Sequence, residues 1–154
     1  HQTAAIAVAL GEALQPEFQT YAKQIIGNAK VLAEELMKRG LKLVTNGTDN
    51  HLILIDVHTS LGLNGNQAEV ALDAAGLTVN KNVIPDDPLP PFKPSGVRLG
   101  TPAITTRGFT EQHMPQLAEW IQGALLHSTD TFKLSEIKSE VKELATQFPL
   151  PSDS

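Results

Sequence analysis

Hydrophobic residues recur at helical spacing over the first part of the chain. Between residues 18 and 39 the apolar positions fall three or four residues apart, and Gly40 supplies a C-terminal stop, which predicts a helix. The alanine-rich segment 3–14 is apolar on nearly all sides, a pattern typical of a helix buried against other structure. Gln15-Pro16 separates these two predicted helices.

Other stretches have the pattern of strands. Residues 52–57 form a continuous apolar run, which is typical of a central strand covered on both faces. Shorter extended segments at 42–45 and 97–101 complete a predicted sheet of about three strands. Residues 77–82 are also extended. The segment 83–95 contains five prolines, so we expect an irregular, stiff loop that cannot join the interior of a sheet.

The remaining helices follow from end signals and periodicity. Asn64 and Gln67 fit a capping box, which predicts a helix that runs to Ala75. Apolar positions at helical spacing predict two more helices, at 114–125 and 135–147. The predicted fold is an α/β two-layer domain of the α+β type, in which a small sheet carries helices on one face.

Size and charge limit the partners of the protein. It has 154 residues, enough for one domain with a hydrophobic core, and no cysteine. The formal net charge is −5, and the lysines are scattered among acidic residues, so no basic patch for nucleic acid is expected. The longest apolar run is about six residues, whereas a membrane helix needs about 20. We expect a cytoplasmic protein and, since the chain starts at His1 rather than methionine, a piece of a longer one.

Several kinds of catalytic site lack a signature here. The chain has no glycine-rich phosphate loop, no histidine pair at the spacing of a zinc site and no serine in a nucleophile elbow. Asp49, Asn50, His51 and Asp56 flank or end the strand predicted at 52–57, and the favoured interpretation is that they are turn and cap residues with local hydrogen bonds. We expect no metal site.

Arg98 is the strongest candidate for a binding residue. It lies on a short extended run between Gly96 and Gly100, and strand alternation points it away from the face shared by Val97 and Leu99. A guanidinium stays charged, and its planar fork fits a carboxylate through two hydrogen bonds. The flanking glycines leave open backbone, which suits close approach by a ligand. The alternative is an arginine on a solvated strand face.

Several short motifs occur in order along the chain, and together they resemble the C-terminal small domain of the serine hydroxymethyltransferase family. They are Gly47-Thr48-Asp49-Asn50-His51-Leu52, Asn80-Lys81-Asn82, Pro85-Asp86-Asp87-Pro88, Gly96-Val97-Arg98-Leu99-Gly100-Thr101-Pro102-Ala103 and Thr106-Arg107-Gly108-Phe109. The resemblance extends from His1 nearly to the C-terminus. It implies a pyridoxal phosphate enzyme of fold type I that interconverts serine and glycine and passes the one-carbon unit to tetrahydrofolate.

The resemblance also implies roles for three residues. Arg98 matches the family arginine that holds the amino acid carboxylate, and Asn82 matches an asparagine at the folate ring. Arg107 matches an arginine near the site. From the residues alone, Asn82 is a turn-initiating asparagine before the proline-rich loop and Arg107 a surface arginine beside a helix.

The chain also departs from what a complete enzyme of that family needs. None of its nine lysines follows the threonine-rich stretch that precedes the cofactor lysine in the family. We therefore expect residues 1–154 to be a single C-terminal domain of a longer enzyme, with the helix in 1–14 leading in from a large domain. Without the cofactor lysine, the chain alone is expected to bind neither pyridoxal phosphate nor tetrahydrofolate. It is also expected to be inactive, because the cofactor carries the difficult chemistry.

Two alternatives remain open on the sequence. One is the matching domain of another fold type I enzyme, such as an aminotransferase, which also holds a carboxylate with an arginine. The other is a non-catalytic binding or oligomerisation module. The parent enzyme is expected to be a homodimer or tetramer, and the domain alone is expected to self-associate through apolar surface that the parent buries.

Overall fold

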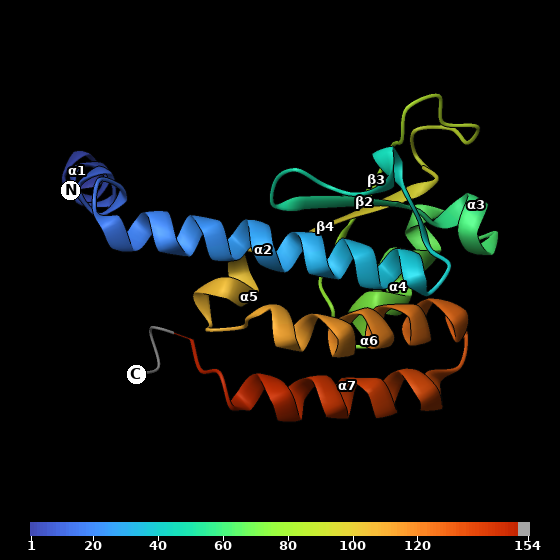
Figure 1. Cartoon of the computed structure of the whole chain (residues 1–154). Coiled ribbons are helices and arrows are strands. Elements are labelled where there is room, and N and C mark those ends of the chain that lie inside the picture. Colours follow the sequence, from blue (N-terminus) through green and yellow to red (C-terminus); the bar gives the residue numbers. More distant parts are fainter. Residues whose placement is uncertain (151–154) are drawn as a thin grey trace.

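The computed structural model describes residues 1–150 and contains one antiparallel sheet with helices on one face (Figure 1). The strand order is β1-β2-β4-β3. Helices α2 and α4 contact the sheet, α6 packs against both of them, and α7 packs against α6 and α4. The elements are α1 Gln2–Ala13, α2 Pro16–Lys38, β1 Lys42–Leu43, the 3₁₀ turn η1 Val44–Asn46, β2 Leu52–Asp56, α3 Val57–Leu61, α4 Gly65–Ala74, β3 Asn80–Asn82, β4 Gly96–Gly100, α5 Pro102–Thr106, the 3₁₀ turn η2 Glu111–His113, α6 Met114–Leu126 and α7 Thr131–Thr146. The predicted two-layer fold is confirmed.

Helix α2 packs against both the sheet and α6. Its buried residues include Ala29, Leu32 and Leu36, which are three of the positions that predicted it. Pro16 is tolerated at its first turn, where no intrahelical hydrogen bond is lost. The chain then reverses at Gly40, whose φ of +85° is a conformation that favours glycine. The predicted amphipathic helix is confirmed.

Helix α1 lies away from the rest of the domain, and it has no buried residue (Figure 1). Its apolar side chains are largely exposed, for example Ile6 at 61% and Leu10 at 63%. The expectation of a buried helix is therefore wrong for this chain. The pattern is that of a buried helix, but among residues 1–150 α1 finds no surface that buries it.

The sheet is apolar on the face that meets the helices. Ile53 and Ile55 of β2 and Val97 of β4 are buried there. Leu54 points to the other face and is half-buried, while Leu52 is exposed. Strand β2 is central, as predicted, but it is covered on one face rather than both, because the helices all pack on the same side.

The elements differ from the sequence prediction in three places. A fourth strand, β3, adds to the free edge of β4 through the pairs Asn80–Arg98 and Asn82–Gly96. Strand β1 is shorter than expected because Thr45 turns the backbone with a φ of 64°. Helix α7 begins earlier than expected, since the side chain of Asp130 caps it by accepting a hydrogen bond from the Lys133 N–H.

We predict that Gly96→Ala destabilises the domain. An ideal Cβ at this position lies 2.6 Å from Ile84 Cγ2 and 2.8 Å from the Asn82 carbonyl oxygen, so β3 or the following loop must move. Overpacking of this kind costs about 1–3 kcal/mol of unfolding free energy. The measurement is urea unfolding followed by the fluorescence of the single tryptophan, Trp120. Gly11→Ala, where a Cβ meets nothing within 4 Å, is the control and should cause no loss. Equal stabilities for both variants would contradict the packing argument.

Candidate functional site

Arg98 lies on the face of the sheet opposite the helices. Val97 is buried on the helix side, whereas Arg98 is exposed, with Leu54 of β2 and Asn80 of β3 opposite it in the register. Within residues 1–150 its guanidinium has no hydrogen-bond or ion-pair partner. The predicted orientation is confirmed, and the structure presents an unpaired cation at the middle of the open sheet face.

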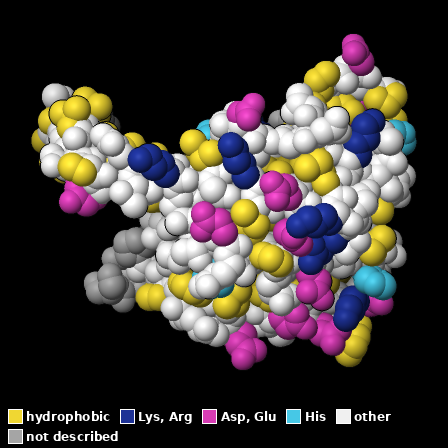
Figure 2. All heavy atoms as spheres, in the orientation of Figure 1, with side chains coloured by type: hydrophobic (Ala, Val, Ile, Leu, Met, Phe, Trp, Pro, Cys, Tyr) yellow, Lys and Arg dark blue, Asp and Glu magenta, His cyan; other side chains and the backbone are white. Residues whose placement is uncertain are grey.

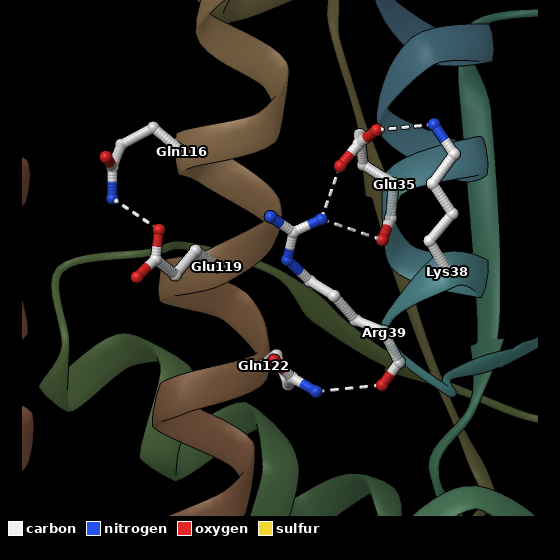
Figure 3. Close-up of polar contacts among 6 residues, drawn as sticks. All are labelled: Glu35, Lys38, Arg39, Gln116, Glu119 and Gln122. Carbon is white, nitrogen blue, oxygen red and sulfur yellow. Dashed lines mark hydrogen bonds and ion pairs between the residues drawn. The ribbon is translucent and has the colours of Figure 1, made fainter.

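The other two arginines of the chain are already bonded to protein groups. Arg39 pairs with the Glu35 carboxylate, which also binds Lys38, and the backbone oxygen of Arg39 accepts a hydrogen bond from Gln122 (Figure 3). The guanidinium of Arg107 donates to the backbone oxygens of Phe148, at 2.8 Å, and Ala145, at 2.5 Å. Arg98 is therefore the one arginine that the described chain leaves available for a ligand.

The glycines beside Arg98 serve packing within the chain. The space next to Gly96 is filled by Ile84 from the proline-rich loop, and a Cβ at Gly100 would lie 3.0 Å from the His51 carbonyl oxygen. The expectation of open backbone for a ligand is therefore wrong. The Arg98 side chain is accessible from the open face of the sheet and not through the backbone on either side.

The segment after Arg98 fixes the end of β4 to α2. Thr101 is fully buried, and its hydroxyl donates to the Ile25 carbonyl oxygen at 2.8 Å. Its N–H donates to the His51 carbonyl oxygen at 3.2 Å, and Pro102 then starts α5. Sequence reasoning predicted only a rigid turn here. The role of Thr101 was missed because its partner lies 76 residues away.

Asn82 shares the open face with Arg98. In the register Asn80 is opposite Arg98 and Asn82 is opposite Gly96, so both asparagines belong to that face. The side chain of Asn82 is half-buried, and its Nδ2 donates to the Val83 carbonyl oxygen at 2.6 Å. The sheet thus places the two residues of the predicted site on one surface.

Arg107 lies elsewhere, at the end of α5. Its bonds to Ala145 and Phe148 satisfy carbonyl groups at the C-terminal end of α7, a common use of arginine. It also lines an apolar cavity of about 270 Å³ beneath Leu99, on the helix side of the sheet. Its placement at the periphery of the site stays a prediction, and the contacts in the described chain are those of a helix cap.

The group at Asp49, Asn50, His51 and Asp56 consists of turn and cap residues. The Asn50 side chain accepts a hydrogen bond from the Leu52 N–H at 2.7 Å. Asp56 caps α3 and pairs with Lys42 at 3.3 Å. Burial raises the pKa of Asp56, but hydrogen bonds from Thr59 and the Lys42 charge outweigh it and hold that pKa low. Across residues 1–150 no three His, Asp or Glu side chains are placed to hold a metal ion.

The lysines do not fit the role of a covalent cofactor site. All nine lie in the described part of the chain, and eight are exposed, with Lys133 half-buried. A hydrogen bond to Glu35 raises the pKa of Lys38, and one to Glu136 raises that of Lys133, so both stay protonated. A lysine that binds an aldehyde must lose its proton, which burial or a neighbouring cation favours.

Asp87 organises the proline-rich loop, and sequence reasoning missed it. Its carboxylate accepts hydrogen bonds from the N–H groups of Ile84, Leu89 and Ser95 and from the Ser95 hydroxyl. Burial raises the pKa of Asp87, but these bonds outweigh it and hold the pKa well below its ordinary value. The sequence signal was a carboxylate among prolines with a serine at the end of the loop.

The two-layer fold is that of a C-terminal domain of a fold type I pyridoxal phosphate enzyme. Over residues 1–121 the chain matches the family model of serine hydroxymethyltransferase. Over 150 residues it is 54% identical to the serine hydroxymethyltransferase of Acidobacterium capsulatum, an alignment that covers 97% of this chain and 35% of that protein. The chain belongs to the serine hydroxymethyltransferase family, and it spans about a third of the length of this curated relative.

These comparisons confirm the family that the motifs predicted. They also set aside the alternative of an aminotransferase domain, since the match covers nearly the whole chain. The structure adds that no helix within residues 1–150 is long and apolar enough to cross a membrane.

The pKa of Asp87 predicts how stability depends on pH. Because its pKa is lower in the fold than the ordinary 3.8, its contribution is complete above pH 3.8 and is lost as the pH falls below that value. The difference in unfolding free energy between the wild-type chain and Asp87→Asn should therefore be constant near neutrality and shrink in acid. Urea unfolding at stepped pH measures it.

Asp86→Asn is the matched control for this experiment. It removes the neighbouring carboxylate, which accepts no hydrogen bond from the described residues, and asparagine tolerates its φ of 52°. If the difference in unfolding free energy between the wild-type chain and Asp87→Asn stays constant as the pH falls below 3.8, the low pKa assigned to Asp87 is wrong.

Proposed function

We propose that this chain is the substrate-binding C-terminal domain, residues 1–154, of an enzyme that interconverts serine and glycine with transfer of a one-carbon unit to tetrahydrofolate. The observation that carries the proposal is the unpaired guanidinium of Arg98 on the open sheet face. The family match supplies the reaction class. In this proposal the helix in 1–14 leads in from the rest of the enzyme, and 83–95 is a loop of the site.

Arg98 binds the amino acid carboxylate. Two parallel N–H donors on one planar group fix both oxygens of a carboxylate, and so fix the orientation of the amino acid. Its surroundings support this role, because Leu54 on one side offers no competing charge and Asn80 on the other is neutral. The proposal thus assigns carboxylate binding to Arg98, whose direction is determined by its place in β4.

Asn82 contacts the folate substrate. Its side-chain amide has both donors and an acceptor, which suits the polar edge of a pterin ring. One donor is used on the Val83 carbonyl oxygen, so an acceptor and a second donor are available for the ligand. Pyridoxal phosphate and tetrahydrofolate belong to the complete enzyme. The lysines of this chain do not fit the cofactor, so its covalent site is assigned to the rest of the protein.

The surface supports the remaining parts of the proposal. Figure 2 shows acidic and basic side chains interspersed on the visible face, without the single-sign cluster that nucleic acid requires. Apolar side chains gather on α1 in the same view. We propose a cytoplasmic homodimer or tetramer for the complete enzyme, and self-association of this domain when it is alone.

We predict that Arg98→Lys weakens binding of serine and glycine. The experiment uses a chimaera in which this chain replaces the matching C-terminal part of the Acidobacterium capsulatum relative. Lysine keeps the charge but loses the paired hydrogen bonds, each of which contributes about 1.5–3 kcal/mol. Dissociation constants should rise about tenfold to a few hundredfold.

Arg39→Lys is the matched control, since Arg39 bonds to Glu35 on the helical side of the domain. It should leave amino acid binding unchanged. If Arg98→Lys gives constants within about twofold of wild type, Arg98 is a surface strand residue and the proposal is wrong.

We also predict that the chain alone forms no specific covalent adduct with pyridoxal phosphate. Its lysines are exposed or half-buried, and none lies in the desolvated, apolar setting that favours an uncharged amine. Mass spectrometry after borohydride reduction should show only substoichiometric labelling spread over several lysines. One stoichiometric adduct at a single lysine would show that the domain holds a cofactor site of its own.

A further inference from the structure

The proline-rich loop joins the two residues that the proposed function assigns to substrates. It leaves β3 directly after Asn82 and enters β4 directly after Ser95, at Gly96. Arg98 follows two positions later in the same strand. The conformation of this loop therefore determines how the end of β3 lies against the strand that carries Arg98.

One carboxylate joins the two ends of the loop. Asp87 Oδ2 accepts hydrogen bonds from the Ile84 N–H at 3.1 Å and from the Ser95 N–H at 3.0 Å. Asp87 Oδ1 accepts from the Leu89 N–H at 2.9 Å and from the Ser95 hydroxyl at 2.5 Å. Hydrogen bonds to an ionised acceptor are about twice as strong as neutral ones.

The Ser95 end of the loop is fixed to the body of the domain. Ser95 is fully buried, and its carbonyl oxygen accepts a hydrogen bond from the His58 N–H at 3.1 Å. The neighbouring Pro94 carbonyl oxygen accepts from the Gly65 N–H at 2.6 Å. Asp87 is therefore held on this side by Ser95, whose segment is bonded to α3 and α4.

The Ile84 end has fewer attachments. Ile84 packs over Gly96, where the missing side chain makes room for it, and its N–H is bonded to Asp87. Between Ile84 and Asn82 lies only Val83, which is exposed and accepts the Asn82 side-chain bond. Without Asp87, Asn82 keeps its strand pairing with Gly96, but the backbone that follows it loses the Ile84 hydrogen bond to the far end of the loop.

We propose that Asp87 is a positioning residue for the folate side of the site: it holds the segment 82–84 against β4 and so orients Asn82 relative to Arg98. This inference rests on the proposed function. It assigns Asp87 no contact with a substrate. The effect falls on the Asn82 end of β3, next to the loop, because Arg98 lies further along the sheet and pairs there with Leu54 and Asn80.

The test compares two ligands in the same chimaera. Asp87→Ala should weaken tetrahydrofolate binding about tenfold or more, while the glycine dissociation constant stays within about twofold. Ser95→Ala, which removes only the hydroxyl bond, should weaken tetrahydrofolate binding less. Asp87→Asn retains one oxygen for Ile84 and Ser95 and should restore part of the loss. Asp86→Asn is the control and should change neither constant.

A second measurement is independent of ligands. In amide NMR spectra of the 154-residue chain, Asp87→Ala should shift the signals of residues 82–84 and leave those of Val97 and Arg98 in place. If Asp87→Ala does not fold, the same amide signals are compared between Ser95→Ala and the wild-type chain, and a shift at residues 82–84 is again expected.

The outcomes separate this inference from the proposed function. Unchanged tetrahydrofolate binding, or an equal loss for both ligands, overturns the positioning role while leaving Arg98 untouched. Unshifted signals at 82–84 overturn it as well. Failure of the proposed function instead appears as unchanged glycine binding in Arg98→Lys.

Discussion

The close packing of three strands at Gly96 is the constraint on which the open sheet face depends. Asn82 of β3 and Ile55 of β2 bring carbonyl oxygens to positions that a Cβ at Gly96 would approach at 2.8 and 3.2 Å, and Ile84 covers the remaining space. Strand β4 is therefore paired along both edges. Because Arg98 lies two residues further along this strand, its direction is determined by sheet geometry and not by any bond of its own.

In the proposed function, Arg98 is a substrate-binding group that does not form a complete site by itself. An exposed ion pair is worth about 0–1 kcal/mol, and a millimolar dissociation constant needs about 4.1 kcal/mol. Arg98 alone is therefore far too weak to capture an amino acid. Strong binding needs a second surface that covers the open face, removes water from the guanidinium and adds further contacts. The chain spans about a third of its curated relative, so most of such a protein is available for that purpose.

Local sequence patterns predicted the parts of the fold that depend on local physics. The periodicity of α2, the capping box at Asn64 and the alternation around Arg98 were all correct, because each is decided within a few residues. Residues 77–82 were predicted to be extended, but the place of β3 in the sheet was missed, because Asn80-Lys81-Asn82 is polar throughout and its pairing with the edge of β4 is not a local pattern. The burial expected for α1 is not found among residues 1–150, because an apolar pattern alone does not specify a packing surface.

The candidate site, like the fold, could be predicted from the sequence only in part. The face on which Arg98 lies followed from alternation, whereas the role proposed for Asn82 comes from the family resemblance and stays a prediction. Arg107 could not be interpreted from sequence, because the carbonyl groups that it binds lie 38 and 41 residues away. Gly96 was expected to leave open backbone for a ligand, but Ile84 fills that space. Ile84 comes from the proline-rich loop, and the prolines alone do not specify the path of that loop.

A crystal structure of the full-length chimaera with glycine bound would show whether Arg98 holds the amino acid carboxylate. We expect both oxygens of the glycine carboxylate to lie about 2.7–2.9 Å from the Arg98 guanidinium nitrogens, in the paired geometry of such contacts. We also expect Arg98 to keep its place in β4 between Leu54 and Asn80. A glycine carboxylate held by another residue, with Arg98 directed into solvent, would contradict this role of Arg98.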